Sequence, residues 1–248
     1  MNNTLKDKVI WLCGASTGIG RSLANELLEK GARLCLSSRD GQVFTDFEGR
    51  VKKLKCDVRK MNDWMACAVA IEREFGHLDM FIYNAGDCIY VNNAEVKHED
   101  FEYLMNVNFH GMVRASEAVL PLLHKSIEPR FVGMTSSVSW LPLPRAEAYG
   151  ASKAAASYFL RSLRLDLENH GIQVSEICPG FVKTPMTEKN DFPMPFLISA
   201  EEAGKKICNA LLKEKQEIHF PKRFTWIVKF IAFLPYFFQY KLCRSFVK

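Results

Sequence analysis

Short apolar runs of strand length alternate along the chain with longer stretches of helical periodicity, and this order constrains the fold more than any other feature. A strand, a helix and a second strand in succession favour parallel pairing, with the helix crossing one face of the sheet. Because such crossovers are right-handed, successive helices can cover both faces. The sequence therefore predicts an α/β chain with a doubly wound parallel sheet.

The expected elements fill most of a chain of 248 residues. We expect strands over residues 8–13, 33–37, 52–56, 78–83, 130–135, 172–178 and 217–220. We expect helices over 19–30, 61–75, 99–125, 147–170 and 199–212, with a break near Pro121 and a capping box of Ser199 and Glu202. The order predicts a single Rossmann-like domain over 1–221, with a substrate loop at about 186–198 and an amphipathic C-terminal extension over 222–248.

Cysteine and histidine occur singly rather than in metal-binding patterns. The eight cysteines include no CxxC pair and most lie inside apolar runs, which favours reduced thiols packed as small hydrophobic side chains. The six histidines lack the spacing of a zinc site, so we expect no metal. The polar N-terminus does not resemble a signal peptide, and we expect a cytoplasmic protein.

The positive charge of the chain is concentrated in its tail. The net charge is +5, yet residues 218–248 hold six Lys or Arg and no Asp or Glu. Without those six, the 33 Lys and Arg fall to 27, against 28 Asp and Glu. A nucleic-acid-binding protein needs a basic surface on its body, so we expect no nucleic-acid partner.

A glycine-rich turn follows the first expected strand. Its sequence is Gly14-Ala15-Ser16-Thr17-Gly18-Ile19-Gly20, and it leads into a helix. Glycines let the backbone turn sharply and approach a pyrophosphate, and the helix N-terminus offers free N–H groups to that anion. The turn therefore predicts a dinucleotide site that uses Gly14, Ser16, Thr17, Gly18, Ile19 and Gly20.

Arg39 stands at the end of the second expected strand, where dinucleotide folds distinguish their cofactors. An acid at this position binds the ribose hydroxyls of NAD, whereas an arginine nearby accommodates the 2′-phosphate of NADP. The sequence therefore favours NADP(H), with NAD(H) as the alternative. A solvated surface arginine is the other interpretation of Arg39.

Tyr149 and Lys153 are four residues apart on an expected helix and so share one face. A tyrosine with an unperturbed pKa of about 10 is a poor base at neutral pH. A nearby ammonium group favours the phenolate and lowers that pKa. The pair predicts that Tyr149 passes a proton to or from a substrate oxygen while a hydride moves between the substrate and a nicotinamide.

These motifs, in this order, resemble the short-chain dehydrogenase/reductase (SDR) family over about residues 8–220. The resemblance implies that Arg39 is the NADP-selecting residue, because Ser38 occupies the place of the aspartate in NAD-using relatives. Relatives usually form dimers or tetramers through their long helices, so a homo-oligomer is also implied. Further cofactor contacts are implied for Asp57, Val58, Asn84, Ala85, Gly86, Tyr149, Lys153, Pro179, Gly180 and Thr184.

The resemblance also assigns a serine and an asparagine to catalysis. The family's spacing to Tyr149 favours Ser136, whereas the local pattern favours Ser137 and requires a one-residue deletion in the following loop. We prefer Ser137, because loops tolerate deletions better than strands tolerate shifts. Asn108 resembles the asparagine that holds a water for a proton relay, with Asn106 as the alternative.

Two apolar segments remain outside these motifs. The segment 191–198 suggests a bulky apolar alcohol or ketone as the substrate, although its side chains can equally pack on the core or on another subunit. The stretch 224–240 is densely aromatic, and its 17 residues are fewer than the roughly 20 that span a bilayer. It suits either a helix in a membrane interface, which would make the protein peripheral, or an extension packed on the body or on another subunit.

The sequence as a whole predicts an NADP(H)-dependent oxidoreductase of the alcohol dehydrogenase or carbonyl reductase type. Its expected substrate is an apolar alcohol or ketone, and its expected catalytic residues are Tyr149, Lys153, Ser137 and Asn108. The alternative is a cofactor-binding sensor or scaffold that lacks catalysis and docks through its tail.

Overall fold

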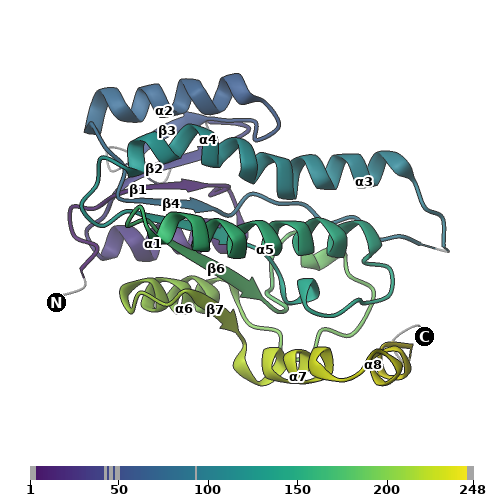
Figure 1. Ribbon diagram of the computed structural model, residues 1–248. Helices are drawn as coiled ribbons and strands as arrows, with labels where there is room; N and C mark the ends of the chain where they lie inside the picture. Colours follow the sequence, from purple (N-terminus) through teal and green to yellow (C-terminus); the bar gives the residue numbers. More distant parts are fainter. Residues whose placement is uncertain (1–3, 42–43, 45–46, 48–50, 93, 245–248) are drawn as a thin grey trace.

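The chain folds around one parallel sheet, and the computed structural model describes residues 4–41, 44, 47, 51–92 and 94–244. The strand order is β3-β2-β1-β4-β5-β6-β7 (Figure 1). The strands are β1 (Val9–Cys13), β2 (Arg33–Ser38), β3 (Val51–Lys55), β4 (Met80–Tyr83), β5 (Arg130–Met134), β6 (Gln173–Pro179) and β7 (Glu217–Phe220). The predicted doubly wound parallel sheet is therefore confirmed.

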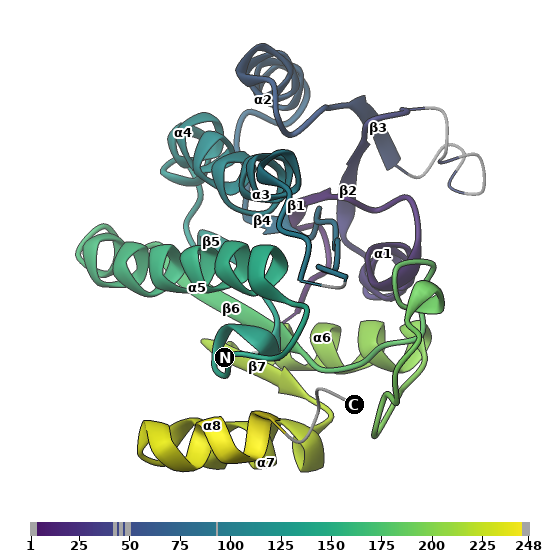
Figure 2. The same cartoon turned by 90° about the vertical axis from the view of Figure 1, so that its right-hand side faces the viewer.

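Helices cover both faces of the sheet (Figure 2). One face carries α1 (Gly18–Glu29) and α6 (Ala200–Leu212), which pack against each other. The other face carries α2 (Met61–Phe75), α4 (Gly111–Leu123) and α5 (Glu147–Glu168), and α3 (His98–Met105) packs against α5.

The side chains of β1 show why the sheet has two apolar cores. Val9, Trp11 and Cys13 lie in the cluster shared with α2, α4 and α5. Ile10 and Leu12 lie in the cluster shared with α1 and α6. Successive side chains of a strand point to opposite faces, so an uninterrupted apolar run is the sequence signature of a strand covered on both sides.

The long helix expected over 99–125 is interrupted, but not at the predicted place. A π-helical turn, η2 (Asn106–His110), separates α3 from α4. Pro121 lies inside the last turn of α4 and does not end the helix. Proline removes one backbone hydrogen bond of the helix, and in the last turn few residues follow whose helical geometry it could disturb. The predicted break near Pro121 was therefore wrong.

Two further helices follow β7 at the edge of the sheet. They are α7 (Lys222–Phe233) and α8 (Tyr236–Arg244), drawn in yellow in Figure 1. Among the residues described, no helix combines the length and the apolar character needed to cross a bilayer.

The winding of the sheet reverses between β1 and β4. The chain passes from β1 outward through β2 and β3, and then returns to β4 on the other side of β1. Because all strands run parallel, their carboxyl ends meet at one edge. In such folds ligands bind in the crevice at that edge.

Candidate active site

A cleft of about 490 Å³ lies at the carboxyl ends of the strands, beside the reversal between β1 and β4. It collects nearly all residues singled out from the sequence, although they come from distant parts of the chain. Three predicted residues are not on its wall: Gly20, Ser137 and Asn108. Those that line it are Gly14, Ser16, Thr17, Gly18, Ile19, Arg39, Asp57, Val58, Asn84, Ala85, Gly86, Tyr149, Lys153, Pro179, Gly180 and Thr184.

The glycine turn is packed too closely for larger side chains. Gly14 has a φ of +84°, and a Cβ atom there would lie 2.5 Å from the Ala85 nitrogen. A Cβ on Gly20 would lie 2.2 Å from the Gly14 oxygen. The Asn84 side-chain amide donates a hydrogen bond to that same oxygen at 2.6 Å. Gly20 therefore serves close packing between α1 and the turn rather than contact with a ligand.

The start of α1 forms one wall of the cleft. The helix begins at Gly18, and Ser16, Thr17 and Gly18 all face the cavity. Within the described residues, the Thr17 side chain makes no capping hydrogen bond and the first turn holds no acid. The exposed N–H groups and the positive end of the helix dipole suit a pyrophosphate. The cradle thus fits the dinucleotide that the sequence predicts.

Two arginines flank the far end of the cleft. Arg39 follows β2 and is exposed on the cavity wall. Arg59, which the sequence analysis missed, also lines the cavity and forms a bidentate pair with Asp57 at 2.9 and 2.6 Å. The hydrogen bond from Arg59 lowers the pKa of Asp57 to about 2. Arg59 is already paired in this way, and Arg39 stands directly after β2, where dinucleotide folds distinguish their cofactors, so Arg39 is the better candidate for a 2′-phosphate.

Tyr149 and Lys153 occupy successive turns at the start of α5. The Lys153 ammonium donates to the Met134 carbonyl oxygen at 3.1 Å and lies 6.0 Å from the centre of the Tyr149 ring. Burial lowers the pKa of Lys153 to about 8 and raises the pKa of Tyr149. At neutral pH the phenol keeps its proton and can donate it, while the lysine remains largely charged.

The structure places Ser136, rather than the preferred Ser137, beside Tyr149. Ser136 has an extended backbone, lines the cleft, and its side chain is close enough to Tyr149 to lower the pKa of the phenol. Ser137 begins the short helix η3 (Ser137–Ser139), which turns its side chain into the buried interior. Of the two serines, Ser136, which the spacing to Tyr149 favours, therefore faces the cleft, and the catalytic role expected for Ser137 stays a prediction.

Asn108 lies one layer behind the cleft, in the π-helical turn. Its amide nitrogen donates to the Asp87 carbonyl oxygen and to the Ser152 hydroxyl, both at 2.9 Å. Its side-chain oxygen accepts from the Asp87 nitrogen at 2.9 Å. A Cβ atom built on Gly86 would lie 3.1 Å from that oxygen and 3.2 Å from the Lys153 ammonium, so the two groups converge on Gly86.

The competing asparagine points elsewhere. The side-chain oxygen of Asn106 accepts from Arg114 at 2.9 Å, and neither residue lines the cleft. A π-helical turn inserts one extra residue into a helix and is frequent at functional sites. Here it is Asn108, and not Asn106, that turns toward Lys153 and Gly86.

Cys88 and Tyr90 lie near the catalytic pair but were not recognised from the sequence. Burial raises the pKa of the Cys88 thiol to about 11, and this side chain is close enough to Tyr149 to affect the pKa of the phenol. Burial also raises the pKa of Tyr90, and the nearby Cys88 thiol contributes to this shift. The cysteines had been interpreted as core residues, and Cys88 is the one that is only partly buried.

Arg145 connects the segment predicted as the substrate loop to the segment that follows β4. Its guanidinium donates to Asp191 in the loop at 2.7 Å and to Asn92 at 2.6 Å. The rings of Tyr90 and Phe192 meet edge to face at 5.3 Å. These contacts join the segment 186–198 to the segment after β4, which also carries Cys88.

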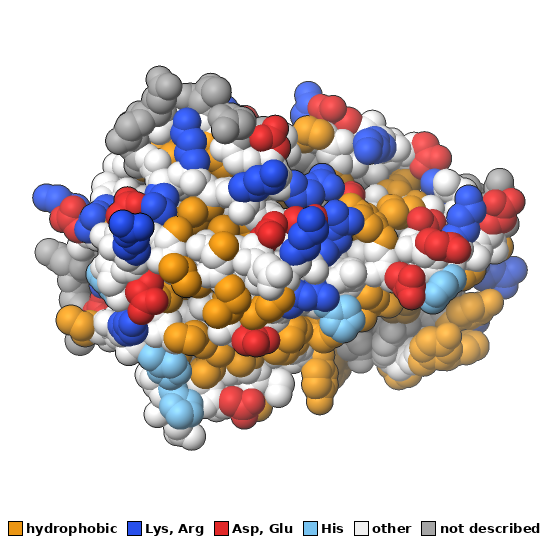
Figure 3. All heavy atoms as spheres, turned by 90° about the horizontal axis from the view of Figure 1, so that it is seen from above, with side chains coloured by type: hydrophobic (Ala, Val, Ile, Leu, Met, Phe, Trp, Pro, Cys, Tyr) orange, Lys and Arg blue, Asp and Glu red, His pale blue; other side chains and the backbone are white. Residues whose placement is uncertain are grey.

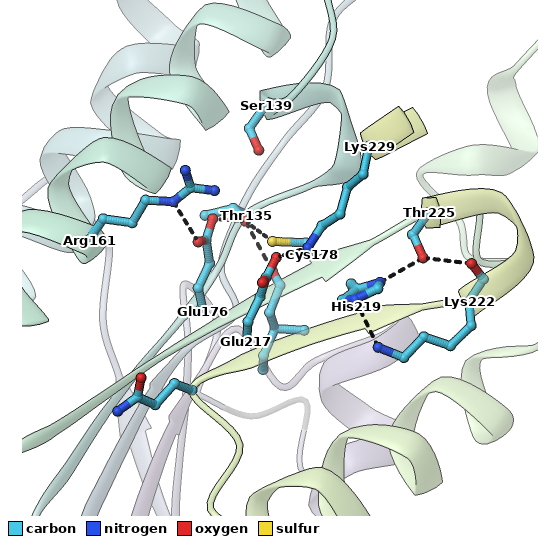
Figure 4. Close-up of polar contacts among 12 residues, drawn as sticks. Thr135, Ser139, Arg161, Glu176, Cys178, Glu217, His219, Lys222, Thr225 and Lys229 are labelled. Carbon is cyan, nitrogen blue, oxygen red and sulfur yellow. Dashed lines mark hydrogen bonds and ion pairs between the residues drawn. The ribbon is translucent and has the colours of Figure 1, made fainter. Parts of the chain in front are cut away.

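A buried polar cluster connects the cleft to α7 (Figure 4). Thr135 lines the cleft, and its hydroxyl donates to Glu176 at 2.9 Å. On β7, Glu217 accepts from Lys229 of α7 at 2.5 Å. His219 is hydrogen-bonded to the Thr225 hydroxyl of α7 at 2.7 Å. Polar contacts thus hold the inner side of α7 against the sheet.

Comparison with known proteins places these features in one family. The family model for short chain dehydrogenases matches residues 8–193. An uncharacterised oxidoreductase of Myxococcus xanthus is 32% identical over 229 residues, which is 90% of each chain. An 11-beta-hydroxysteroid dehydrogenase A of Sesamum indicum is 34% identical over 190 residues, covering 73% of this chain and 54% of its own.

A solved structure shares the fold over nearly the whole length. It is a short chain dehydrogenase of Burkholderia cenocepacia in complex with NADP, and it superposes with a TM-score of 0.85. The two chains are 23% identical, and the alignment covers 99% of each.

Proposed function

The chain belongs to the short-chain dehydrogenase family and is an oxidoreductase of that type, and from this premise we propose that it uses NADP(H) to interconvert an apolar alcohol and its ketone. The observation that carries the proposal is one cleft in which the glycine turn, Tyr149, Lys153 and Ser136 face the same cavity. The nicotinamide, when bound, supplies or accepts the hydride.

Tyr149 is the proposed proton donor in reduction and acceptor in oxidation. Its raised pKa keeps the phenol protonated at neutral pH, which is the form that can protonate the oxygen of a ketone. Ser136 lines the cleft beside Tyr149, so a substrate oxygen placed between the two hydroxyls would be oriented by both. Lys153 would support the phenolate that remains after proton transfer, because its ammonium lies on the same side of the cleft.

Asn108 is proposed to restore the proton through a relay toward solvent. It converges with Lys153 on Gly86, although it does not itself line the cavity. The relay therefore starts from the buried layer behind the cleft, and its loss would slow turnover without removing the cofactor site.

Cofactor choice is proposed to depend on Arg39. It is the arginine that the sequence places at the end of β2, and it is exposed on the cleft wall. The NADP complex of the Burkholderia relative supports this preference, since the two proteins share their fold over almost the entire chain.

The substrate class is proposed from the side chains around the catalytic pair. Tyr90, Phe192 and Phe181 form a chain of ring contacts at 5.3 and 6.1 Å beside the cleft. Aromatic side chains next to a cleft favour an apolar substrate body. The steroid dehydrogenase from Sesamum indicum, named for a bulky apolar substrate, supports the same class.

A homo-oligomer is also proposed. Tyr158 and Leu165 on α5 have exposed fractions of 79% and 70%, which leaves large apolar side chains on the outer surface of that helix. Pairing of this surface with a second copy would cover them.

The experiment that tests the oxidoreductase proposal compares the wild-type protein with Tyr149→Phe. We expect Tyr149→Phe to lose turnover of apolar ketones with NADPH by at least about a thousandfold, because proton transfer is lost. Binding of NADPH, followed by fluorescence, should stay within about twofold, because the phenol hydroxyl is not part of the nucleotide cradle. Normal turnover by Tyr149→Phe would refute the mechanism. NADPH binding without turnover by the wild-type protein would instead favour the non-catalytic sensor or scaffold.

A further inference from the structure

The two C-terminal helices present different surfaces to the protein and to the outside. The inner side of α7 is anchored by Thr225 and Val228, which are buried, and by the Lys229–Glu217 pair. Figure 4 shows Thr225, Lys222 and Lys229 pointing toward β7. The outer side carries exposed apolar side chains, here called the aromatic face: Trp226, Ile227, Phe230, Phe233, Phe237 and Tyr240.

The aromatic face is more exposed than scattered surface hydrophobics usually are. Phe233 has an exposed fraction of 89% and Phe230 of 66%. They stand at helical spacing with Trp226 and are continued by Phe237 in the next helix, so they gather on consecutive turns. A contiguous apolar surface of this kind marks a site of interaction with a protein or a membrane.

The charged side chains that α7 and α8 themselves carry are all basic. Beyond Glu217 the sequence has no acid. Lys222 and Lys229 point toward β7, whereas Arg223, Lys241 and Arg244 are exposed. The Lys241 ammonium lies 4.4 Å from the centre of the Phe237 ring, directly beside the aromatic face. By contrast, basic and acidic side chains are interspersed on the surface over α2, α3 and α4 (Figure 3).

The charge of this surface indicates which kind of partner binds to it. A second copy of the chain, related by a twofold axis, would bring the same basic surface against itself, and like charges repel. A bilayer that contains acidic lipids offers the opposite charge to the lysines and arginines and an apolar layer to the rings. We propose that α7 and α8 form a docking surface for an anionic lipid bilayer, with the aromatic face embedded in the interface.

The helices lie on the membrane in this arrangement rather than crossing it. With 12 residues, α7 is about 18 Å long, which is shorter than the roughly 30 Å of a hydrocarbon core. The chain is extended at Leu234 and passes through Pro235 before α8 begins, so the two helices do not form one longer rod. Aromatic rings and basic side chains on short helices are typical of interfacial binding.

The docking surface borders the substrate side of the cleft. Phe224 of α7 packs against the Phe181 ring at 5.3 Å and against the Phe196 ring of the substrate loop at 6.5 Å. A Cβ atom on Gly180, which lines the cleft, would lie 2.6 Å from the Phe224 ring. Docking therefore places the substrate loop next to the lipid surface, from which an apolar substrate can enter.

Vesicle binding tests the surface directly and requires no catalysis, so its failure is distinguishable from failure of the proposed oxidoreductase function. Purified full-length protein is floated with phosphatidylcholine vesicles, with and without phosphatidylglycerol. We expect binding to the vesicles with phosphatidylglycerol, and we expect high salt to weaken it because charge attraction is screened. Vesicles of phosphatidylcholine alone should bind at least about tenfold less.

Two double variants separate the aromatic face from general surface hydrophobicity. Phe230→Ser/Phe237→Ser should weaken vesicle binding by at least about tenfold. The matched control, Val69→Ser/Ile127→Ser, removes two exposed apolar side chains from other surfaces and should bind as the wild type does. A charge variant, Lys241→Glu/Arg244→Glu, should lose the preference for phosphatidylglycerol while its thermal unfolding stays unchanged.

Three outcomes would overturn the proposal. The first is recovery of the wild-type protein without vesicles of either composition. The second is an equal loss of vesicle binding in both double-serine variants. The third is a reduced sedimentation coefficient of Phe230→Ser/Phe237→Ser in the absence of lipid, which would identify the aromatic face as a contact between copies of the chain.

Discussion

Burial acts in opposite directions on the two titratable groups at the start of α5. It raises the pKa of Tyr149, because the phenolate is poorly solvated, and lowers that of Lys153 to about 8, because the ammonium is poorly solvated. The protein therefore holds a proton donor and a group that is ready to lose its charge slightly above neutral pH. Two residues of the same type in this environment would have their pKa values shifted in the same direction.

Arg39→Ala tests the cofactor preference at one residue. We expect NADPH affinity to fall by about tenfold or more, because the 2′-phosphate loses a charge-assisted hydrogen bond. NADH, which has no phosphate there, should bind almost unchanged. Titration of both cofactors measures the two dissociation constants, with Lys60→Ala as a control that removes a basic residue nearby. Equal losses for NADPH and NADH would refute the selective role of Arg39.

Ser136→Ala and Ser137→Ala test which serine serves the site. Ser136→Ala should lower kcat by about a hundredfold, because the substrate oxygen loses one of its two hydroxyl partners. Ser137→Ala should leave kcat within about threefold, since that side chain is buried away from the cleft. Steady-state kinetics with saturating NADPH gives both values. The reverse order of effects would restore the interpretation that favoured Ser137.

At the scale of elements, patterns set by neighbours in sequence were predictable and those set by packing were not. The third strand was expected over 52–56 and is Val51–Lys55. One of the two hydrogen bonds of the predicted capping box is present, because the Ser199 hydroxyl accepts from the Glu202 nitrogen at 3.1 Å. The π-helical turn was missed, because its cause is the placement of Asn108 against Asp87 and Ser152, which are distant in sequence.

The same distinction holds for the site. The glycine turn and the Tyr149–Lys153 pair could be identified because their residues are close together in the chain. Arg59 was missed because only the fold brings it to the cleft, and Cys88 because only the fold brings it near Tyr149; no short motif marks either residue. Asp57 with a basic residue two positions later was the one available signal for Arg59.

Arg145→Ala tests whether the hydrogen bonds of Arg145 hold the proposed substrate loop in place. We expect KM for an apolar ketone to rise about three- to tenfold and the dissociation constant of NADPH to stay unchanged, because the contacts join the loop to the segment after β4. The exposed ion pair should contribute little to stability. Asp191→Asn keeps a hydrogen-bond acceptor and should have a smaller effect on KM. An unchanged KM in Arg145→Ala would show that the loop is held by its apolar contacts alone.

Over the whole molecule, the buried cluster at β7 joins the tail to the sheet. His219 lies between the rings of Trp140 and Trp226, at 5.8 and 5.5 Å. The Lys222 ammonium donates to its second ring nitrogen at 2.8 Å, which requires the imidazole to be neutral. The attachment of α7 therefore depends on a histidine that cannot take up a proton without losing a partner.

Stability should fall on mild acidification because of His219. Burial lowers its pKa from 6.5 to about 4, so the unfolded chain binds the proton more readily in this interval. The contribution of the neutral imidazole is fully present above pH 6.5 and is lost as the pH falls toward 4. We expect a loss of about 2 kcal/mol between pH 7 and pH 5.

Thermal or urea unfolding at several pH values measures this loss. His219→Gln, which cannot be protonated, should show a flatter dependence between pH 7 and pH 5. The charged groups facing His219 include Glu217, Lys222 and Lys229. The ordinary pKa of a lysine lies well above the interval from pH 5 to pH 7, and that of a glutamate lies just below its lower end. An unchanged slope in the variant would assign the acid sensitivity to other groups.

The predicted cofactor residues and the segments proposed for substrate and membrane binding follow one another along the chain. All predicted cofactor residues on the cleft wall end at Thr184, whereas the substrate loop, α7 and α8 follow it. Under the roles proposed above for the loop and for α7 and α8, a recombination event near residue 185 would exchange substrate preference and membrane binding together and leave the predicted cofactor residues unchanged. One constraint travels with such a graft: α6 must keep a small residue at Gly204, where a Cβ atom would lie 2.9 Å from the backbone of Ser22 in α1.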